Sequence, residues 1–205
     1  MANPNAPRGI IPYAYRSGAP YNGAVRTYYV PVGNSTALYI GDPVVLITNS
    51  SDGNGIQTVE AATAGATNNG GITYAVLGSF AGRSNNAGQT TIPVLQSDHV
   101  YLPAATAGYI YVADDPTLLY WAQEDSVGGA LVSGASGRNV SLVAGTSSNA
   151  AGYSGWQIQS STLSAAYLYQ MRIVQLLQEA DNAVGVNAKW LTFINNHPFN
   201  STTGI

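Results

Sequence analysis

The chain of 205 residues is 45% hydrophobic, which excludes a largely disordered protein and provides enough apolar surface for a proper core. Only 8% of the residues are charged, so neutral polar residues such as Ser, Thr and Asn solvate the surface, or another molecule covers much of it. With a net charge of −3 and seven scattered basic residues, the chain lacks the basic patch that nucleic acid requires, and the absence of cysteine excludes disulfides and Cys-ligated metal sites.

Residues 1–23 are predicted to form an extended N-terminal arm. Four prolines disfavour a helix or a central strand here, yet the segment also holds Tyr and Ile side chains that a flexible linker would not need. We expect these side chains to lie against another surface, either a partner protein or the chain's own domain. The candidate interface residues of the arm and of the following strand are Ile10, Ile11, Tyr13, Tyr15, Tyr21, Tyr28 and Tyr29.

The turn at residues 41–43 is predicted to have a structural role. The residue before a proline is confined to extended backbone angles, and an aspartate at this position accepts hydrogen bonds from nearby backbone N–H groups. We therefore expect the carboxylate of Asp42 to stabilise the turn.

Residues 24–205 are predicted to form a single β domain. Short runs of β-branched and aromatic residues are bounded by Gly, Asn and Pro, and the Gly and Asn residues supply the positive φ angles that tight turns need. This spacing is typical of an all-β protein, either a jelly-roll-like sandwich or a compact β-barrel. The expected strands are 25–32, 37–48, 57–61, 72–80, 90–95, 99–102, 109–113 and 118–123.

The C-terminal part contains a region, 163–179, in which two patterns overlap. Its apolar residues recur at three- and four-residue spacing, which fits a helix, and Tyr167, Tyr169 and Met171 alternate, which fits a strand. We predict a helical turn at 160–166, a strand at 168–178, a turn at 181–182, a last strand at 185–194, and surface loops at 133–137 and 144–155.

No motif of a known catalytic or metal-binding type is found. The histidines, His99 and His197, are far apart in the sequence, and no Gly-x-Ser-x-Gly elbow accompanies them. The acidic pairs at 114–115 and 124–125 lack the spacing of a calcium loop, and the Gly-rich segment 65–71 lacks the lysine of a phosphate loop. No apolar run approaches the ~20 residues of a membrane span. We therefore predict a protein that is not an enzyme, with no cofactor or metal and no nucleic-acid or membrane partner.

Tyrosine is the unusual residue of this chain. Fourteen Tyr stand beside three Phe and three Trp. Tyr favours strands in its own right, but it also provides large contact area at a small entropic cost, which is why it is enriched in interfaces. Together with the low charge, the tyrosines favour an extensive interface.

Several motifs resemble those of small head proteins of tailed bacteriophages. They are Ala-Pro-Arg-Gly (6–9), Gly-Ala-Pro-Tyr-Asn-Gly (18–23), Tyr-Tyr-Val-Pro (28–31), Ala-Leu-Tyr-Ile-Gly-Asp-Pro-Val (37–44), Val-Ala-Asp-Asp-Pro (112–116), Asp-Asn-Ala-Val-Gly-Val-Asn-Ala-Lys (181–189) and Ile-Asn-Asn-His (194–197). The chain is similar to the decoration, or cement, proteins that sit on the outside of the major capsid shell. It departs from their pattern at Tyr-Trp-Ala-Gln (120–123), where Phe and an acidic residue before Gln are expected.

This resemblance implies a virion structural protein, made in the host cytoplasm and placed on the capsid exterior. Its partners would be the major capsid protein, whose subunits it bridges, and further copies of itself in a homo-oligomer, with a trimer favoured and a dimer possible. The resemblance implies no catalytic residues. The alternative is a carbohydrate- or receptor-binding β module, in which Tyr120, Trp121 and Trp156 would stack on sugar rings if they are exposed.

Overall fold

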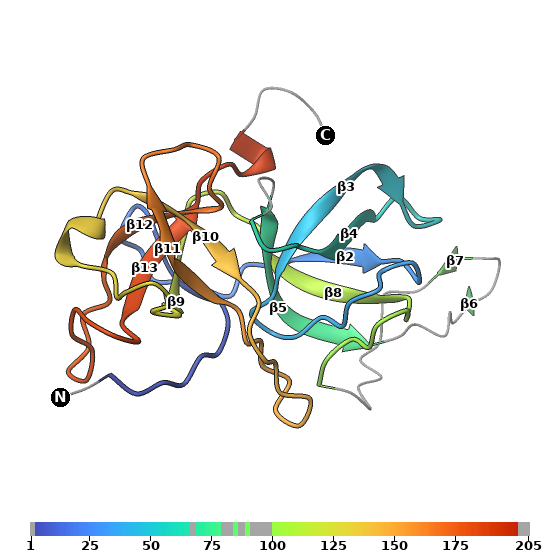
Figure 1. Ribbon diagram of the computed structural model, residues 1–205. Coiled ribbons are helices and arrows are strands. Elements are labelled where there is room, and N and C mark those ends of the chain that lie inside the picture. Colours follow the sequence, from blue (N-terminus) through green and yellow to red (C-terminus); the bar gives the residue numbers. More distant parts are fainter. Residues whose placement is uncertain (1–2, 66–68, 79–83, 86–88, 91–99, 201–205) are drawn as a thin grey trace.

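A computed structural model describes residues 3–65, 69–78, 84–85, 89–90 and 100–200 of the chain (Figure 1). Within these residues the backbone forms strands, turns and two short 3-10 helices, η1 (Ser133–Ala135) and η2 (Pro198–Asn200). The prediction of an all-β protein is therefore confirmed. Among the described residues, none lie in a helix with the length and hydropathy needed to cross a bilayer.

The first structural unit is a closed five-stranded barrel, on the right of Figure 1. Strands β2 and β4 run parallel, the other neighbours are antiparallel, and β8 closes the barrel against β2. Closure leaves no free strand edge in this unit. The strands in barrel order are β2 (Arg26–Val30), β4 (Gln57–Ala61), β3 (Pro43–Ser51), β5 (Asn69–Gly78) and β8 (Gly108–Ala113).

The barrel is filled by side chains that alternate inward along its strands. Leu38 and Leu102 come from two loops that bridge each other through backbone hydrogen bonds of 2.8 and 2.9 Å, and both side chains are buried. Among the residues that the structure describes, the buried members of this interior cluster are Tyr28, Val30, Leu38, Val44, Val59, Leu102, Ile110 and Val112.

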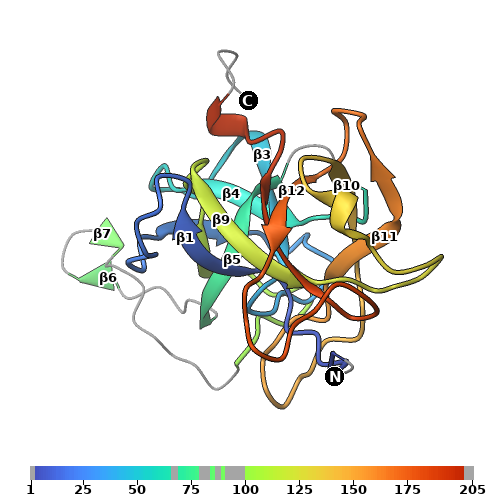
Figure 2. The same cartoon turned by 90° about the vertical axis from the view of Figure 1, so that its left-hand side faces the viewer.

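The second unit is an antiparallel six-stranded sheet, on the left of Figure 1 and facing the viewer in Figure 2. The sheet curls, so that the residues after its second strand meet its last strand: the Asp125 N–H donates to the Ile158 carbonyl at 2.9 Å. The strands in sheet order are β1 (Ile11–Tyr15), β9 (Leu118–Gln123), β13 (Lys189–Ile194), β12 (Met171–Leu176), β10 (Asn139–Val143) and β11 (Gln157–Ser164).

The core of the sheet extends to the barrel. Ile72 of β5 and Ala113 of β8 are buried in the cluster that otherwise fills the curled sheet, with Tyr120 and Trp190 among its largest side chains. The Tyr120 hydroxyl also donates to the Ala113 carbonyl at 3.0 Å. The two units therefore share packed side chains. A closed barrel is observed, while a jelly roll is not confirmed.

Several strand predictions are confirmed. The predicted strands 25–32, 57–61, 109–113 and 118–123 correspond to β2, β4, β8 and β9. The predicted strand 37–48 begins only at Pro43, because the preceding residues form a turn with isolated bridges at Leu38 and Ile40. The predicted strand 72–80 matches β5, apart from residues 79–80. The described residues do not include 79–80, the predicted strand 90–95 beyond its first residue, or His99.

The helical turn predicted at 160–166 is wrong, because these residues belong largely to β11. Pairing with β10 satisfies the backbone of β11 along the sheet, and this tertiary contact overrides the local spacing of apolar residues. The predicted strands 168–178 and 185–194 are found as the shorter β12 and β13. Strands β1 and β10 were not predicted, and β6 (Ser84–Asn85) and β7 (Gln89–Thr90) form a separate two-stranded ribbon.

The N-terminal segment lies against the chain's own sheet. Ile11–Tyr15 is the edge strand β1, which pairs with β9, and Ile10 is completely buried in the core of the sheet. Further upstream, the Gln123 side chain donates to the Pro4 carbonyl at 2.7 Å and accepts from the Ala6 N–H at 3.0 Å. The arm was expected to lie against either a partner protein or the chain's own domain. The structure shows these residues against the chain's own domain.

Candidate functional site

The seven predicted interface residues do not share one environment. Ile10 and Tyr28 are buried in the two cores of the chain itself, so neither is available to a partner in this conformation. The Tyr28 hydroxyl instead donates to Asp114 Oδ2 at 2.5 Å. Ile11, Tyr15, Tyr21 and Tyr29 are partly exposed, and Tyr13 is 48% exposed.

Three tyrosine rings gather where the sheet meets the barrel, and Tyr13 is joined to them through its backbone. The ring of Tyr21 lies 6.2 Å from that of Tyr15 and 5.8 Å from that of Tyr74, measured between centroids, and the Tyr21 N–H donates to the Tyr13 carbonyl. We call Tyr13, Tyr15, Tyr21 and Tyr74 the tyrosine cluster. Sequence reasoning missed Tyr74, which is exposed and comes from β5. Tyr29 lies elsewhere, with its ring centroid 5.5 Å from that of Tyr109.

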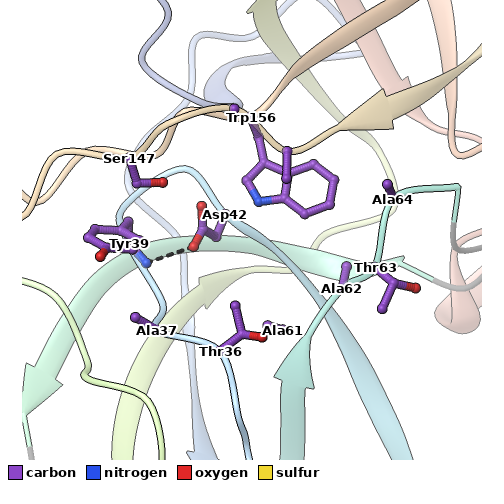
Figure 3. A pocket seen from close by; sticks show the side chains of 12 residues that line it. Thr36, Ala37, Tyr39, Asp42, Ala61, Ala62, Thr63, Ala64, Ser147 and Trp156 are labelled. Carbon is purple, nitrogen blue, oxygen red and sulfur yellow. Dashed lines mark hydrogen bonds between the residues drawn. The ribbon is translucent and has the colours of Figure 1, made fainter.

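A pocket of about 510 Å³ opens between the two units (Figure 3). Its volume lies in the range of about 300–1,000 Å³ that is usual for small-molecule sites. One wall comes from the barrel and its loops, and the other from the segment before β11. The lining residues are Thr36, Ala37, Tyr39, Asp42, Ala61, Ala62, Thr63, Ala64, Ala144, Gly145, Ser147 and Trp156.

Asp42 is the single charged residue of this lining, and it is only 4% exposed. Its Oδ2 accepts from the Tyr39 N–H at 2.8 Å, which confirms the predicted role of the carboxylate in the turn. Burial raises the pKa of Asp42 to about 6, although the nearby Ser154 hydroxyl and the Tyr39 N–H act in the opposite direction. Its Oδ1 accepts no hydrogen bond of normal geometry from the described residues.

Two glycines with positive φ let three backbone segments meet beneath the pocket. At Gly41, with φ +96°, a Cβ atom would stand 2.9 Å from the Arg8 carbonyl oxygen. At Gly9, with φ +78°, it would stand 2.5 Å from the Cβ of Ser154. The segments are joined by backbone hydrogen bonds from Ile10 to Gly41 and from Ser154 to Ile40, at 3.0 and 2.9 Å. Asp42 is therefore held in a closely packed crossing.

The two aromatic residues of the pocket are also fixed by contacts. The Tyr39 ring stacks on Tyr101 with centroids 4.9 Å apart, and its hydroxyl donates to Asn149 Oδ1 at 2.5 Å. Trp156 is 8% exposed, and its backbone N–H donates to the Ser154 hydroxyl at 3.0 Å. Figure 3 shows Tyr39, Asp42, Ser147 and Trp156 around the same hollow.

The acidic and histidine residues considered as catalytic candidates have structural contacts. His197 is buried, its Nδ1 accepts from the Phe199 N–H at 3.1 Å, and burial lowers its pKa to about 4. Asp115 accepts from the Thr117 N–H at 2.7 Å, as expected of a turn carboxylate. Within the described residues, no three His, Asp or Glu side chains are grouped so that they would hold a metal ion.

The pair Glu124 and Asp125 joins the end of β9 to β11. Glu124 is fully buried, its Oε2 accepts from the Leu131 N–H at 2.7 Å, and burial raises its pKa to about 7. Asp125 Oδ1 accepts from both the N–H and the hydroxyl of Ser160, at 3.0 and 2.9 Å. These contacts help to close the curled sheet.

Comparison of the chain with protein-family models, with curated proteins and with solved structures finds no match. The functional argument therefore rests on the sequence and on the geometry of the tyrosine cluster and the pocket.

Proposed function

We propose that the protein is a virion structural component that decorates the outer surface of a tailed-phage capsid and bridges subunits of the major capsid protein. The resemblance of its motifs to decoration proteins suggests this role. The structural observation that supports it best is the tyrosine cluster, which lies on both the sheet and the barrel.

The tyrosine cluster has the character of a protein-binding surface. Tyr13 and Tyr74 are 48% and 40% exposed, and the partly buried Tyr21 lies between the strands that carry them. Tyrosine combines a large apolar ring with one polar tip, and interface cores are depleted in charge, as this chain is. A decoration protein that contacts two capsid subunits through such a surface stabilises the shell, because separating the subunits also breaks these contacts.

Co-sedimentation with empty capsids tests this proposal. The experiment uses the full chain and capsids built from the major capsid protein of the virus that encodes it. The proposal is supported if the unaltered protein binds capsids and the double variant Tyr13→Ser, Tyr74→Ser binds them at least tenfold more weakly. Tyr153→Ser is the matched control, because Tyr153 is similarly exposed at 42% but lies outside the cluster. Absence of capsid binding by the unaltered protein would overturn the proposal.

Light scattering tests the proposed homo-oligomer, for which a trimer is favoured and a dimer is the second possibility. The measured mass is compared with the chain mass of 21.3 kDa. If the protein is a monomer at the concentration at which it decorates capsids, its self-association is limited to the capsid surface.

The alternative, a carbohydrate-binding module, receives less support from the aromatic residues first considered for it. Tyr120 is fully buried, and Trp156 is 8% exposed where it lines the pocket. Trp121 is partly exposed, but the Lys189 ammonium lies 5.7 Å from its ring centroid. Selective binding on a glycan array, without capsid binding, would favour this alternative.

A further inference from the structure

We propose that the pocket between the barrel and the sheet binds an organic cation, either the ammonium group of a lysine side chain or small amine, or the guanidinium group of an arginine. The shared chemistry is a positive head on an aliphatic stem. This inference does not depend on the proposed capsid role, because it rests on the pocket residues alone.

The first argument is the unpaired charge of Asp42. The described residues form two ion pairs, Arg26 with Asp114 and Lys189 with Glu179, and neither involves Asp42. Arg8 belongs to a segment packed beneath the pocket, but its guanidinium lies over the Tyr153 ring at 5.7 Å. A buried carboxylate without a counter-ion is costly, and a bound cation offsets part of this cost.

The second argument is the direction of the available acceptor. Oδ2 is occupied by the Tyr39 N–H, whereas Oδ1 is buried and, although the Ser154 hydroxyl lies near the carboxylate, accepts no hydrogen bond of normal geometry from the described residues. Asp42 lines the pocket, so a small shift of the lining would let an N–H donor in the pocket reach an acceptor that is held in place by the turn. Charge-assisted hydrogen bonds of this kind are stronger than neutral ones.

The third argument is the remaining lining. Trp156 and Tyr39 supply aromatic rings beside the carboxylate, and aromatic rings attract cations through their π faces. Ala61, Ala62 and Ala64 provide an apolar wall of small side chains that suits the methylene groups of a stem. A calcium ion would need about six to eight oxygen ligands. Neutral sugars would satisfy Oδ1 but leave the charge unpaired.

Binding of defined probes to the isolated full-length protein tests the inference. The probes are N-acetyl-lysine amide, N-acetyl-arginine amide and butylamine, with N-acetyl-glutamine amide, glucose and calcium chloride as comparisons. In a ¹⁵N NMR titration we expect the cations to shift the backbone amide signals of Tyr39 and Gly145. The inference would be overturned if the cations do not bind, if the neutral probes bind equally well, or if calcium binds in place of the amines.

Asp42→Asn is the decisive variant, because the asparagine oxygen still accepts from the Tyr39 N–H while the charge is removed. We expect at least tenfold weaker cation binding, with folding confirmed by thermal melting. Asp181→Asn makes the same change at an exposed position and should leave binding unaltered. Unchanged cation affinity of Asp42→Asn would overturn the inference.

A pH series provides a second readout that does not depend on a variant. Since the pKa of Asp42 is raised to about 6, its ionised fraction falls about tenfold between pH 7 and pH 5, and cation affinity should fall with it. The titratable side chain that interacts electrostatically with Asp42 is Tyr39, which stays neutral because burial raises its pKa. Affinity that is independent of pH would contradict ion pairing with Asp42.

Competition distinguishes the two sources of the cation. Displacement of bound butylamine by empty capsids would assign the pocket to a lysine or arginine side chain of the capsid. Retention of the amine on decorated capsids would assign it to a free small amine.

Discussion

At the scale of single residues, Glu124 and Asp42 are two of the three carboxylates that are buried in the described part of the chain. Glu124 and Asp42 both have their pKa raised by burial, to about 7 and about 6. In the unfolded chain both groups ionise near their ordinary values of 4.5 and 3.8. Ionisation therefore costs more in the folded protein than in the unfolded chain.

The pH dependence of stability follows from this difference. A raised folded-state pKa gives a stability contribution that is present at low pH and is lost as pH rises from the unfolded to the folded value. For Glu124 the loss spans about pH 4.5 to 7 and amounts to at most about 3 kcal/mol. Because the lowered pKa of His197 acts in the opposite direction below about pH 6.5, we expect the urea unfolding free energy to fall between about pH 6.5 and pH 8, and to fall less in Glu124→Gln. An equal fall in this variant and in an Asp181→Asn control would contradict the assignment.

Gly41 gives a second prediction at this scale. Gly41→Ala places a methyl group 2.9 Å from the Arg8 carbonyl oxygen at a φ of +96°. We expect the unfolding free energy to fall by about 2–4 kcal/mol, through strain and overpacking together. Gly18→Ala is the control, since its φ is +90° with no heavy atom within 4 Å of the added carbon. It should cost about 1–2 kcal/mol, and equal losses in the two variants would show that the contact with Arg8 is unimportant.

At the scale of elements, the N-terminal strand has consequences for folding. The sequence suggested an extended arm at residues 1–23, whereas Ile10 is buried and β1 covers the edge of β9. Deletion of residues 1–23 should therefore lower the melting temperature and promote aggregation through the uncovered edge. A truncated protein with unchanged melting, followed by circular dichroism, would contradict this view.

Ile10→Ala isolates the buried side chain from the strand itself. We expect a loss of about 2–5 kcal/mol in unfolding free energy, as for other large-to-small changes in a core. Ile11→Ala provides the control, because Ile11 is only partly buried and should cost clearly less. Similar losses at both positions would show that Ile10 is not a core residue in solution.

Element by element, the sequence predicted strands well where β-branched and aromatic residues cluster, as in β2 and β8. It failed at β10 and β11, where polar residues are buried by pairing across the sheet: Asn139, for example, accepts from Arg172 Nε at 2.9 Å. The role of Asp42 in its turn was predicted because it depends on neighbouring residues. The pocket was not predicted, because Asp42 and Trp156, which both line it, are more than 100 positions apart in the sequence.

At the scale of the whole molecule, the scarcity of charge determines how attachment to a capsid should respond to solvent. Exposed ion pairs contribute about 0–1 kcal/mol each and are screened by salt, whereas burial of apolar and tyrosine surface is not weakened by salt. We expect capsid binding through the tyrosine cluster to persist to about molar NaCl and to fail first in urea or guanidinium. Release at about 0.5 M NaCl and constant pH, measured by co-sedimentation, would show that electrostatic contacts dominate.

The pairing of β1 with β9 has a consequence for the order of folding. Tyr15 is opposite Leu118 in this pair, and the Arg16 N–H donates to the Thr117 carbonyl at 2.8 Å, so the chain leaves the sheet and returns to it at the same place. In topological terms, β1 and β9 form a hairpin whose turn is the entire barrel. Closing a loop of about a hundred residues is slow and entropically unfavourable unless the loop is already compact. We therefore expect the barrel to collapse before the edge of the sheet closes, and replacing the barrel by a short turn would make the pairing of β1 with β9 a local contact.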